Sequence, residues 1–316
     1  MATLPDISHL KINHFKVFEA LIAHGSIQAA AEVLHQTQAS VKRSIKELET
    51  TLGVTLVIHG KGGVVLTDIG QMFETRMNLV LNEIQRSVDE IKQIKNYQDG
   101  TVVFGCSHLK TLKVLPDVVE RVQKKYPKVR ISIHEGQQSE LMPSLQIGKL
   151  DFFIGILSNG ISFEEYVEEP LLTCQYCVIA RKDHPLAHAT SLVELRNAKW
   201  YLPLAVPGYY NFLEAIIFPE GQGSECSILR GNSIAVGERL LLEADYLSIV
   251  PLPMFNLNFV KNQFCIIPIK ESLPDGHYSL IYRKQGFLTP LAKLLIDEIR
   301  IECGKKVIYR DNKTDK

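Results

Sequence analysis

The pattern of apolar and polar positions predicts three short helices and a hairpin in the first 68 residues. Residues 10–23 carry Phe15, Phe18 and Ile22 at helical spacing, and Gly25 ends that helix. Ser26 is a good N-cap for a second helix, whose expected apolar face is Ala30, Val33 and Leu34. Thr37 caps a third helix, in which an inward stripe is formed by Val41, Ile45 and Leu48. The stretch TLVIHGKGGVVLT that follows is typical of two short strands around a glycine-rich turn.

A single long helix is expected next, from Thr67-Asp68 to about Tyr97. Its apolar side chains recur every three or four positions: Phe73, Met77, Val80, Ile84, Val88, Ile91 and Ile94. About 30 residues at ~1.5 Å per residue give a helix ~45 Å long. A lone helix of that length has no core of its own, so its stripe needs a partner. A second copy of the chain is the simplest candidate.

Segments that favour strands and helices alternate from residue 98 onward. Strands are expected at 101–106, 129–135, 150–157, 174–180, 199–204, 226–229, 246–250, 264–269 and 277–283. Helices are expected at 108–125, 139–147, 210–218, 233–244 and 289–302. Such alternation is typical of βαβ units with parallel sheets. The ~210 residues are enough for two small doubly wound lobes, so the predicted fold class is α/β.

Composition excludes several classes of protein. Apolar residues make up 46% of the chain and charged residues 22%, which is normal for a soluble globular protein. No apolar run approaches the ~20 residues that span a bilayer, and the N-terminus lacks the pattern of a signal peptide. We therefore expect a cytoplasmic protein with no membrane partner.

The six cysteines are scattered at positions 106, 174, 177, 226, 265 and 303. Cys174 and Cys177 form one CxxC, but no second CxxC and no nearby pair of histidines completes a zinc site. Because the surrounding run LLTCQYCVIA is apolar and rich in strand formers, a buried strand is the favoured interpretation. Cys226 has no second cysteine close by for a redox pair, so an oxidant sensor is disfavoured. We expect no metal and no cofactor.

The third helix is a candidate for reading DNA, although the whole chain has a formal net charge of zero. Residues 1–68 hold six Lys or Arg and six Asp or Glu, but the stretch 33–46 holds three cations and no acid. The small, polar start of the helix, TQAS, lets the backbone approach the bases. Gln38 can pair with adenine, and Arg43 can reach guanine or phosphate. Lys42 and Lys46 suit phosphates. Helical hairpins are common, so the spacing of these residues alone does not exclude an ordinary helical hairpin that has no role in DNA binding.

Residues 10–70 resemble the winged helix-turn-helix of the LysR-type transcriptional regulators. The positions that match the family pattern are Phe18, Gly25-Ser26, Ala30-Ala31, Leu34, Gln38, Arg43, Ile45, Leu48-Glu49, Leu52-Gly53, Leu56, Leu66-Thr67 and Gly70. Further family-like stretches are LPDVVERVQKKYP, GKLDFFIG and LLEADYLSIVP. The resemblance therefore covers nearly all of the chain.

The resemblance implies a chain of three parts. These are a winged helix-turn-helix DNA-binding domain at 1–68, a dimerisation linker helix at 69–97, and an effector-binding domain at 98–307. The last would have two lobes like a periplasmic binding protein, with lobe I at 98–172 and 276–307 and lobe II at 173–275. The implied partners are double-stranded promoter DNA, RNA polymerase, a small-molecule effector and further copies of the chain, as a dimer of dimers. Effector binding would change the angle between the lobes and so the spacing of the DNA-binding heads.

Several positions expected to contact DNA depart from the family pattern. The candidate DNA-binding residues are Ser26, Gln28, Thr37, Gln38, Ala39, Lys42, Arg43, Lys46, His59 and Lys61. Ala39 replaces a proline, which at the first helical position would pre-organise the helix start. Lys42 replaces a serine and adds a cation near the groove. His59 replaces an arginine that would meet the DNA backbone, and Lys61 is expected to take over part of that contact.

The effector site is expected in loops at strand ends and helix starts, where ligands of α/β sheets bind. The candidate residues are Ser107, His108, Gly136, Gln137, Gln138, Pro207, Gly208, Tyr209, Asn232 and Ser233. For each residue alone, an ordinary helix cap remains an alternative. Because helix N-termini favour anions and no arginine pair is evident, we expect a small organic anion, such as an aromatic carboxylate or sulfonate. The wing and the stretch LPDGHYSLIYR look most like the toluenesulfonate-regulator branch of the family.

Two other classes of protein remain as alternatives. A hydrolase-like enzyme would use Ser107 and His108 as nucleophile and base, but adjacent residues rarely make a productive pair. The sequence also has no GxSxG, GxGxxG, P-loop or HExxH motif, so we expect no catalytic residues. A solute-binding protein without a DNA role would need a signal peptide and would not need the first 97 residues.

Overall fold

A computed structural model describes residues 7–60, 63–95, 100–107, 114–157, 164–204, 209–218, 221–255, 258–285 and 288–305. The chain divides into two compact units, which are Met1–Ile91 with Gln146–Lys149, and Lys92–Leu145 with Leu150–Lys316. Within the described stretches, no helix combines the length and the apolarity that a membrane span requires.

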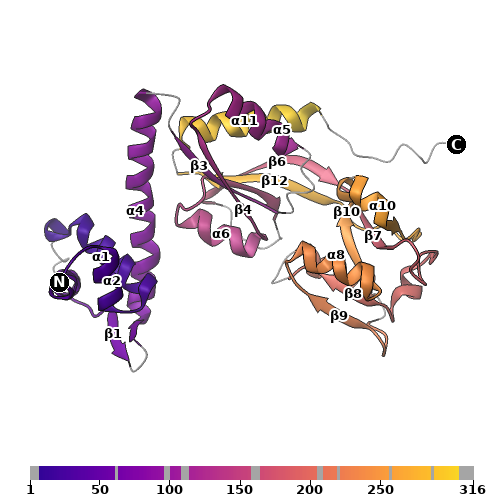
Figure 1. The fold of residues 1–316 in the computed structure, drawn as a ribbon, viewed down its shortest axis with the longest axis horizontal. Coiled ribbons are helices and arrows are strands. Elements are labelled where there is room, and N and C mark those ends of the chain that lie inside the picture. The colour runs from indigo at the N-terminus through magenta and orange to yellow at the C-terminus, as the bar shows by residue number, and fades with distance from the viewer. Residues whose placement is uncertain are drawn as a thin grey trace. The chain divides into compact units, whose positions relative to one another are not determined.

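The first unit holds a three-helix head, a two-stranded wing and most of a long helix (Figure 1). Its elements, after a 3-10 turn at Ile7–His9, are α1 (Ile12–His24), α2 (Ile27–Val33), α3 (Gln38–Leu52), β1 (Val57–Gly60), β2 (Gly63–Leu66) and α4 (Asp68–Lys95). The helices and the hairpin predicted from the apolar pattern are all present.

Side-chain caps determine where α2 and α3 begin. Ser26 Oγ accepts the backbone N–H of Ala29 at 3.1 Å, and Thr37 Oγ1 accepts that of Ser40 at 3.1 Å. Gly25 ends α1 with a φ of 69°, a left-handed conformation that glycine adopts without strain. These contacts confirm the helix ends that the sequence predicts.

The core of the head is built from the predicted apolar stripes, with one exception. Its buried side chains include Val17, Phe18, Ala30, Val41, Leu48 and Leu56. Val33, expected on the apolar face of α2, is 53% exposed. It is the last residue of that helix, and the chain turns at His35, whose φ is 52°. As a result Leu34, rather than Val33, packs against the core.

The wing is tied to the head by main-chain and carboxylate hydrogen bonds. β1 and β2 pair antiparallel, and the N–H of Val64 donates to the carbonyl of Gly25 at 2.9 Å. Glu49 of α3 accepts the N–H groups of Leu56 and Val57 at 2.7 and 3.2 Å. The wing therefore has a defined position beside α3.

The apolar stripe of α4 is covered at one end only. Its first turns pack on the head, where the Phe73 ring meets the Phe18 ring edge-on with centroids 5.5 Å apart, and Met77 is buried. Farther along the stripe, the exposed side chains are Val80, Ile84, Val88 and Ile91. The predicted stripe is present from Phe73 to Ile91 and lies open from Val80 onward in the single chain, while the side chain of Ile94 lies outside the described residues.

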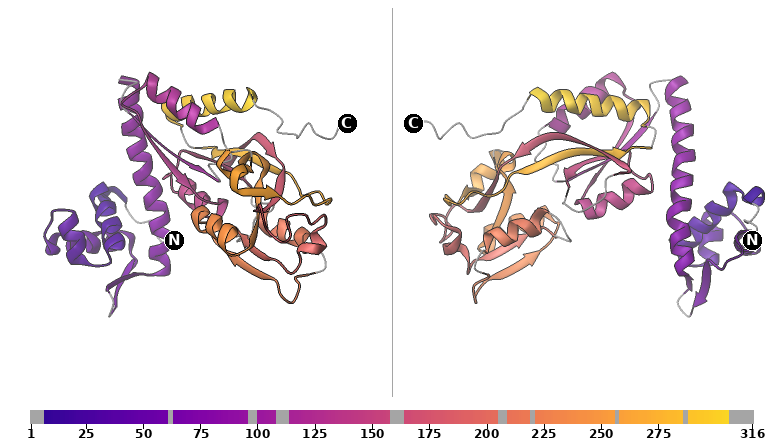
Figure 2. Two further views of the ribbon diagram at one scale, coloured as in Figure 1. Left: turned by 45° about the vertical axis from the view of Figure 1, so that its right-hand side comes forward. Right: turned by 180° about the vertical axis from the view of Figure 1, so that it is seen from behind.

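Lobe I of the second unit is a five-stranded sheet with helices on both faces (Figure 2). Its strands are β3 (Thr101–Cys106), β4 (Arg130–Glu135), β5 (Phe152–Ile156), β6 (Tyr166–Cys174) and β12 (Gly276–Arg283), in the order β4-β3-β5-β12-β6. Its helices are α5 (Val114–Lys125), α6 (Gln138–Gln146) and α11 (Pro290–Lys305). α5 and α11 pack against Phe104 and Phe152 on one face, and α6 packs against Phe153 on the other.

Lobe II repeats this layered arrangement. Its strands are β7 (Tyr176–Arg181), β8 (Lys199–Leu202), β9 (Ser227–Arg230), β10 (Tyr246–Pro251) and β11 (Phe264–Ile266), in the order β11-β7-β10-β8-β9. α7 (Tyr209–Ile217) and a 3-10 turn (Leu192–Leu195) pack against Trp200 on one face. On the other face, Ile179 and Tyr201 meet the helices α8 (Ile234–Glu243), α9 (Leu252–Phe255) and α10 (Asn258–Gln263).

Both sheets are mixed, whereas the alternation of strands and helices predicted parallel sheets. β3 pairs parallel with β4 and β5, but β12 pairs antiparallel with β5 and β6. In lobe II, β8 runs parallel to β9 and β10, while β7 is antiparallel to β10 and β11. In lobe I the antiparallel pairs arise because the chain leaves through β6 and returns through β12.

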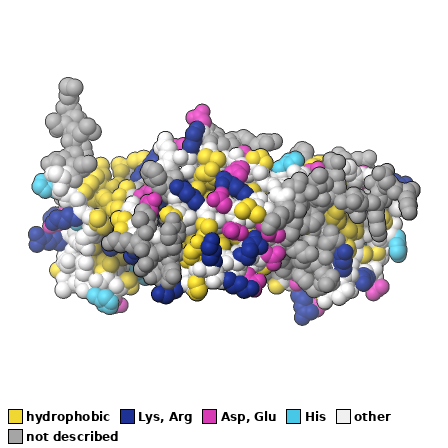
Figure 3. Space-filling view, turned by 90° about the horizontal axis from the view of Figure 1, so that it is seen from above, with side chains coloured by type: hydrophobic (Ala, Val, Ile, Leu, Met, Phe, Trp, Pro, Cys, Tyr) yellow, Lys and Arg dark blue, Asp and Glu magenta, His cyan; other side chains and the backbone are white. Residues whose placement is uncertain are grey.

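The outer face of lobe I carries charges of both signs. Arg121 of α5 pairs with Glu298 and Glu302 of α11 at 3.2 and 3.1 Å. Arg300 of α11 pairs with Glu169 of β6 at 2.6 Å. Figure 3, which looks onto this side of the molecule, shows cationic and acidic side chains intermixed. The zero net charge thus reflects charges of both signs that are paired on this face, not a lack of charged residues.

Candidate functional site

The outward face of α3 carries half of the residues predicted to contact DNA. The exposed residues are Gln38, Ala39, Lys42, Arg43 and Lys46. The opposite face of the helix is buried in the head through Val41, Ile45 and Leu48. This separation follows from the spacing of apolar residues along the helix. The polar start and the three cations therefore project away from the core.

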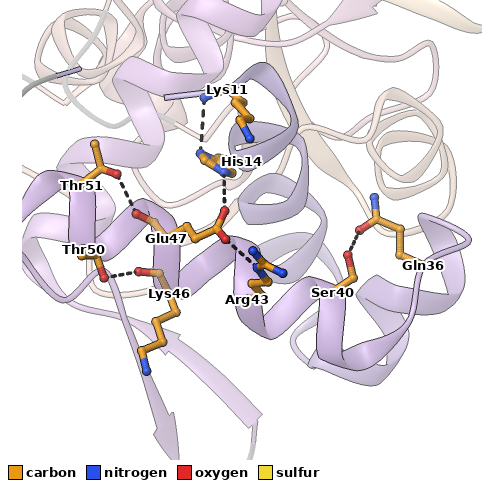
Figure 4. Close-up of polar contacts among 9 residues, drawn as sticks. All are labelled: Lys11, His14, Gln36, Ser40, Arg43, Lys46, Glu47, Thr50 and Thr51. Atoms are coloured by element: carbon orange, nitrogen blue, oxygen red, sulfur yellow. Dashed lines mark hydrogen bonds and ion pairs between the residues drawn. The ribbon is translucent and has the colours of Figure 1, made fainter. Parts of the chain in front are cut away.

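Arg43 is held by a series of polar contacts that begins at α1 (Figure 4). Arg43 Nε donates to Glu47 Oε1 at 2.7 Å, and Glu47 Oε2 lies 3.4 Å from His14 Nε2. His14 Nδ1 accepts the backbone N–H of Lys11 at 3.4 Å, and the other ring nitrogen, Nε2, faces Glu47. His14 is 4% exposed, whereas the Arg43 side chain is 82% exposed. A buried ring thus anchors an exposed guanidinium through one carboxylate.

The ion pair orients Arg43 more than it stabilises the fold. The hydrogen bond from Arg43 lowers the pKa of the Glu47 carboxyl, and the same bond raises the pKa of Arg43. Both groups are open to solvent, where such pairs contribute little to stability. Among the contacts of the described residues, only Nε of the guanidinium is engaged. The terminal nitrogens keep their donors for a base edge or a phosphate.

The other residues predicted to contact DNA are less clear candidates. Ser26 and Thr37 are N-caps, so their side-chain oxygens already accept a backbone N–H. Gln28 is exposed on α2, and its amide donates to a carboxylate one turn further along. His59 lies in β1, but its side chain and the whole of Lys61 lie outside the described residues.

Sequence reasoning misplaces one residue on α3 and overlooks two others. Ala39 is the second helical residue, not the first, because Thr37 is the N-cap. Glu47 follows Arg43 by four residues, a spacing that brings side chains together on a helix, so a signal for that pair was available. His14 comes from α1, and only the packing of α1 on α3 brings it to the pair.

A cavity of about 230 Å³ lies between the lobes and extends into lobe II. Its lining includes the end of β4 and the start of α6 from lobe I, and the start of α8 from lobe II. Four of the residues predicted to bind the effector line it: Gly136, Gln137, Asn232 and Ser233. The fold therefore brings two of the loops predicted for the effector site, one from each lobe, to the same cavity.

The remaining predicted effector residues do not line this cavity. Ser107 is buried at the end of β3, and its Oγ has no hydrogen-bond partner among the described residues. Gln138 is the first residue of α6 and is half-buried. Tyr209 begins α7, but its side chain lies outside the described residues. His108, Pro207 and Gly208 lie outside them entirely.

Tyr201 is a lining residue that sequence reasoning does not identify. Its hydroxyl donates to the carbonyl of Ser233 at 2.8 Å. Gly237 of α8 faces the ring, and a Cβ there would lie 2.5 Å from a ring carbon, so only glycine allows this approach. Tyr201 thereby joins β8 to the start of α8 and forms part of the cavity wall.

A hydrogen bond joins the two lobes at the cavity. Glu140 of α6 accepts Asn232 Nδ2 at 2.8 Å, and Asn232 Oδ1 accepts the N–H of Leu204 at 3.3 Å. Glu140 Oε2 also accepts the N–H of Gln137 at 2.7 Å. This carboxylate therefore caps its own helix and holds the opposite lobe. The sequence places Glu140 in a helix, but nothing in its pattern indicates the partner.

Two buried thiols lie where the chain passes from lobe I to lobe II. Cys174 ends β6 and Cys177 lies in β7, which confirms the buried-strand interpretation with a break at Gln175. Burial raises the pKa of each of these two thiols to about 12. Among the residues that the structure describes, no group of three or more His, Cys, Asp or Glu side chains is placed to hold a metal ion.

Both domains match models of known protein families. Residues 12–71 match the bacterial regulatory helix-turn-helix proteins of the lysR family, and residues 95–304 match the LysR substrate binding domain. The HTH-type transcriptional regulator TdcA of Escherichia coli strain K12 is 31% identical over 287 residues, which is 91% of this chain and 91% of that protein.

Solved structures share the fold. The crystal structure of CbnR, a LysR family transcriptional regulator, matches with a TM-score of 0.69 and 17% identity over 93% of this chain and 99% of that chain. Full-length CbnR complexed with its target DNA matches with a TM-score of 0.66 and 19% identity over 93% of this chain and 100% of that chain. None of these relatives points to the toluenesulfonate-regulator branch, which is not confirmed. The two family matches and the similarity to TdcA show that this chain belongs to the LysR family of bacterial transcriptional regulators.

Proposed function

We propose that this regulator acts in the cytoplasm, binds promoter DNA through α3 and the wing, contacts RNA polymerase, and responds to a small molecule in the cavity between the lobes. The observation that carries the proposal is the outward face of α3, where a polar start precedes three exposed cations. CbnR, which shares the fold, is bound to its target DNA in a solved structure, and this supports a DNA partner. The relatives are regulators and not enzymes, which argues against a hydrolase-like role.

The residues of α3 have different roles in this proposal. Gln38 and Ala39, at the start of the helix, approach the base edges in the major groove. Arg43 reads guanine or binds phosphate through its terminal nitrogens. Lys42 and Lys46 hold phosphates and determine orientation without reading sequence. Their charges explain how a chain of zero net charge binds a polyanion.

The exposed stripe on α4 supports assembly through this helix. Ile84 and Val88 lie one turn apart on the stripe and are exposed in the single chain. A second copy of α4 would cover them, as helices with such stripes pair in coiled coils. Two such dimers would then form the dimer of dimers.

The cavity supports regulation by a small molecule. It is lined from both lobes, so a bound molecule would favour one angle between them over another. In an assembly of several chains, that angle would affect the spacing of the DNA-binding heads. The toluenesulfonate-regulator branch remains only a prediction from the wing and the segment before Arg283.

DNA binding is the first test. A gel shift with duplex DNA that flanks this protein's own gene is expected to show a complex that weakens steeply as salt is raised. Absence of any complex at low salt would contradict the proposal. An unrelated duplex of equal length measures the non-specific part.

Assembly is tested by placing charge on the α4 stripe. Ile84→Asp combined with Val88→Asp is expected to dissociate the oligomer, as measured by light scattering. Thr75→Asp adds the same type of charge at an exposed position on the opposite side of the helix and is the matched control. An unchanged mass for the double variant would rule out pairing through this stripe.

A further inference from the structure

The inner part of the cavity is an apolar chamber within lobe II. It lies between the sheet strands β7 and β10 and the helices α8, α9 and α10. Its wall includes the buried side chains of Ile179, Leu241, Val250, Met254, Val260 and Phe264. The volume of the whole cavity, about 230 Å³, is below the ~300–1,000 Å³ of pockets for drug-sized ligands. The chamber therefore suits one small apolar group, such as a phenyl ring or a branched alkyl chain.

The mouth of the cavity is acidic. Among the described residues that line it there are three carboxylates, from Glu135 at the end of β4, Glu140 of α6 and Glu238 of α8. The same described lining contains no lysine, arginine or histidine. Since like charges repel, a bound anion would be disfavoured beside these groups, whereas a cation would be attracted.

Some of the backbone donors at this mouth are already bound by the protein's own side chains. The N–H of Gln137, at the start of α6, donates to Glu140 Oε2 at 2.7 Å. The N–H of Val236, in the first turn of α8, donates to Ser233 Oγ at 3.3 Å. The Tyr201 hydroxyl donates to the Ser233 carbonyl. One donor at each helix start is therefore bound by a side chain of the protein itself, beside the three carboxylates.

We propose that the effector is a small amphiphilic amine, whose apolar group fills the chamber and whose ammonium group faces the three carboxylates. This inference rests on the proposed function, in which the cavity is the effector site. It replaces the organic anion expected from the sequence, because three carboxylates and no cation among the described lining residues surround the two helix N-termini.

The same chemistry suggests how the binding of an amine would change the contact between the two lobes. Glu140 Oε1 accepts Asn232 Nδ2 at 2.8 Å and so links lobe I to lobe II. An ammonium group is a stronger donor to a carboxylate than an amide is. An amine that engages Glu140 would compete with Asn232 and change the link between the lobes.

The test uses the full-length protein and four probes: 2-phenylethylamine, 3-phenylpropanoate, 2-phenylethanol and methylamine. Isothermal calorimetry and thermal unfolding are expected to show the tightest binding for 2-phenylethylamine. The neutral alcohol should bind more weakly, and the carboxylate and methylamine should not bind, since one carries the wrong charge and the other lacks the apolar group. Binding of the carboxylate as tight as that of the amine, or no binding by any probe, would overturn the inference.

Variants at the mouth test the role of charge. Glu135→Gln combined with Glu238→Gln is expected to weaken 2-phenylethylamine binding about tenfold and to leave 2-phenylethanol binding unchanged. Glu243→Gln, on the same helix but outside the lining and paired with Arg239, is the control and should bind the amine normally. Equal losses for both phenyl probes in the double variant would indicate damage to the chamber and would count against the charge argument.

Promoter binding is measured in parallel by gel shift without any probe. If the promoter is bound but no amine binds, the effector inference fails and the regulator proposal stands. If the promoter is not bound under any condition, the proposed function fails, whatever the calorimetry shows.

Discussion

The recognition face of α3 and the mouth of the cavity carry opposite charges, within a chain whose formal net charge is zero. Exposed cations follow the start of α3, whereas three carboxylates line the mouth near the starts of α6 and α8. All three places are helix N-termini, whose dipoles favour anions equally. Under the two proposals above, the side chains around a helix start, and not the dipole, decide which partner a surface accepts.

The two regions also differ in how their donors are used. On α3, Thr37 caps the helix, and the guanidinium of Arg43 keeps its terminal nitrogens available. At the mouth, Glu140 and Ser233 each accept one N–H group at the start of their own helix, and the three carboxylates add further acceptors. A polyanion therefore finds donors at α3, and an anion at the mouth would find acceptors instead.

Loss of the guanidinium on α3 is expected to have the largest effect. Arg43→Ala should cost about 1–3 kcal/mol of binding free energy at the specific site and should relax the preference for that site. The fold and the oligomer should be unchanged, because the side chain is exposed and its ion pair contributes little to stability. Gel shifts with the specific duplex and an unrelated duplex measure both effects.

Arg239→Ala is the matched control for this prediction. Arg239 of α8 is also exposed and also pairs with a glutamate four residues later, at 2.7 Å. It does not line the cavity. Equal losses of specific binding in the two arginine variants would contradict the assignment of Arg43 to the DNA interface.

Removal of a single helix cap in each region is expected to have the next largest effect. Thr37→Ala and Ser233→Ala each delete one side-chain acceptor, and each should cost ~1 kcal/mol of unfolding free energy. Thr37→Ala should weaken promoter binding and leave 2-phenylethylamine binding unchanged. Ser233→Ala should do the reverse. Urea denaturation, gel shift and calorimetry on the two variants measure this crossover, and parallel losses in both assays would contradict it.

Most of the fold, and the exposed face of α3 that carries the predicted DNA-binding residues, follow from the sequence. The stripe of Val41, Ile45 and Leu48 identifies the inner face of α3 and so the outer face as well. Local signals also predict the caps at Ser26 and Thr37, because a cap depends on neighbours within one turn. Features that depend on residues close together in the sequence, such as these caps and the stripe, are predicted correctly.

Features that depend on two distant segments are not predicted. His14 meets Glu47 only because α1 packs on α3, and Glu140 meets Asn232 only because the lobes face each other. The acidic mouth, on which the amine proposal rests, is likewise not evident from the sequence, since its charges come from three separate elements. The prediction of parallel sheets was wrong because the alternation of strands and helices does not reveal that β12 returns antiparallel beside β5.

Removal of one phosphate-binding cation on α3 is expected to have a smaller, uniform effect. Lys46→Ala should weaken binding to specific and unrelated duplexes alike and should reduce the salt slope by about one unit. The reason is that one phosphate contact and its released counterion are lost. Lys124→Ala, at an exposed lysine of α5 paired with Glu120, is the control. A selective loss at the specific site would show that Lys46 reads a base.

Hydrogen peroxide is expected to have no effect on promoter binding. Oxidation of a cysteine would be a regulatory signal that does not act through the cavity. The thiolate is the reactive form of cysteine, and burial raises the pKa of Cys174 and Cys177 to about 12. Burial also raises the pKa of the thiols of Cys226 and Cys265. At pH 7 a thiol with a pKa of 12 is ~10⁻⁵ ionised, so micromolar hydrogen peroxide should leave promoter binding and the mass of each cysteine peptide unchanged. A peroxide-induced change in the gel shift that Cys226→Ser abolishes would show that this chain senses an oxidant, and the acidic mouth would then not be its only route of control.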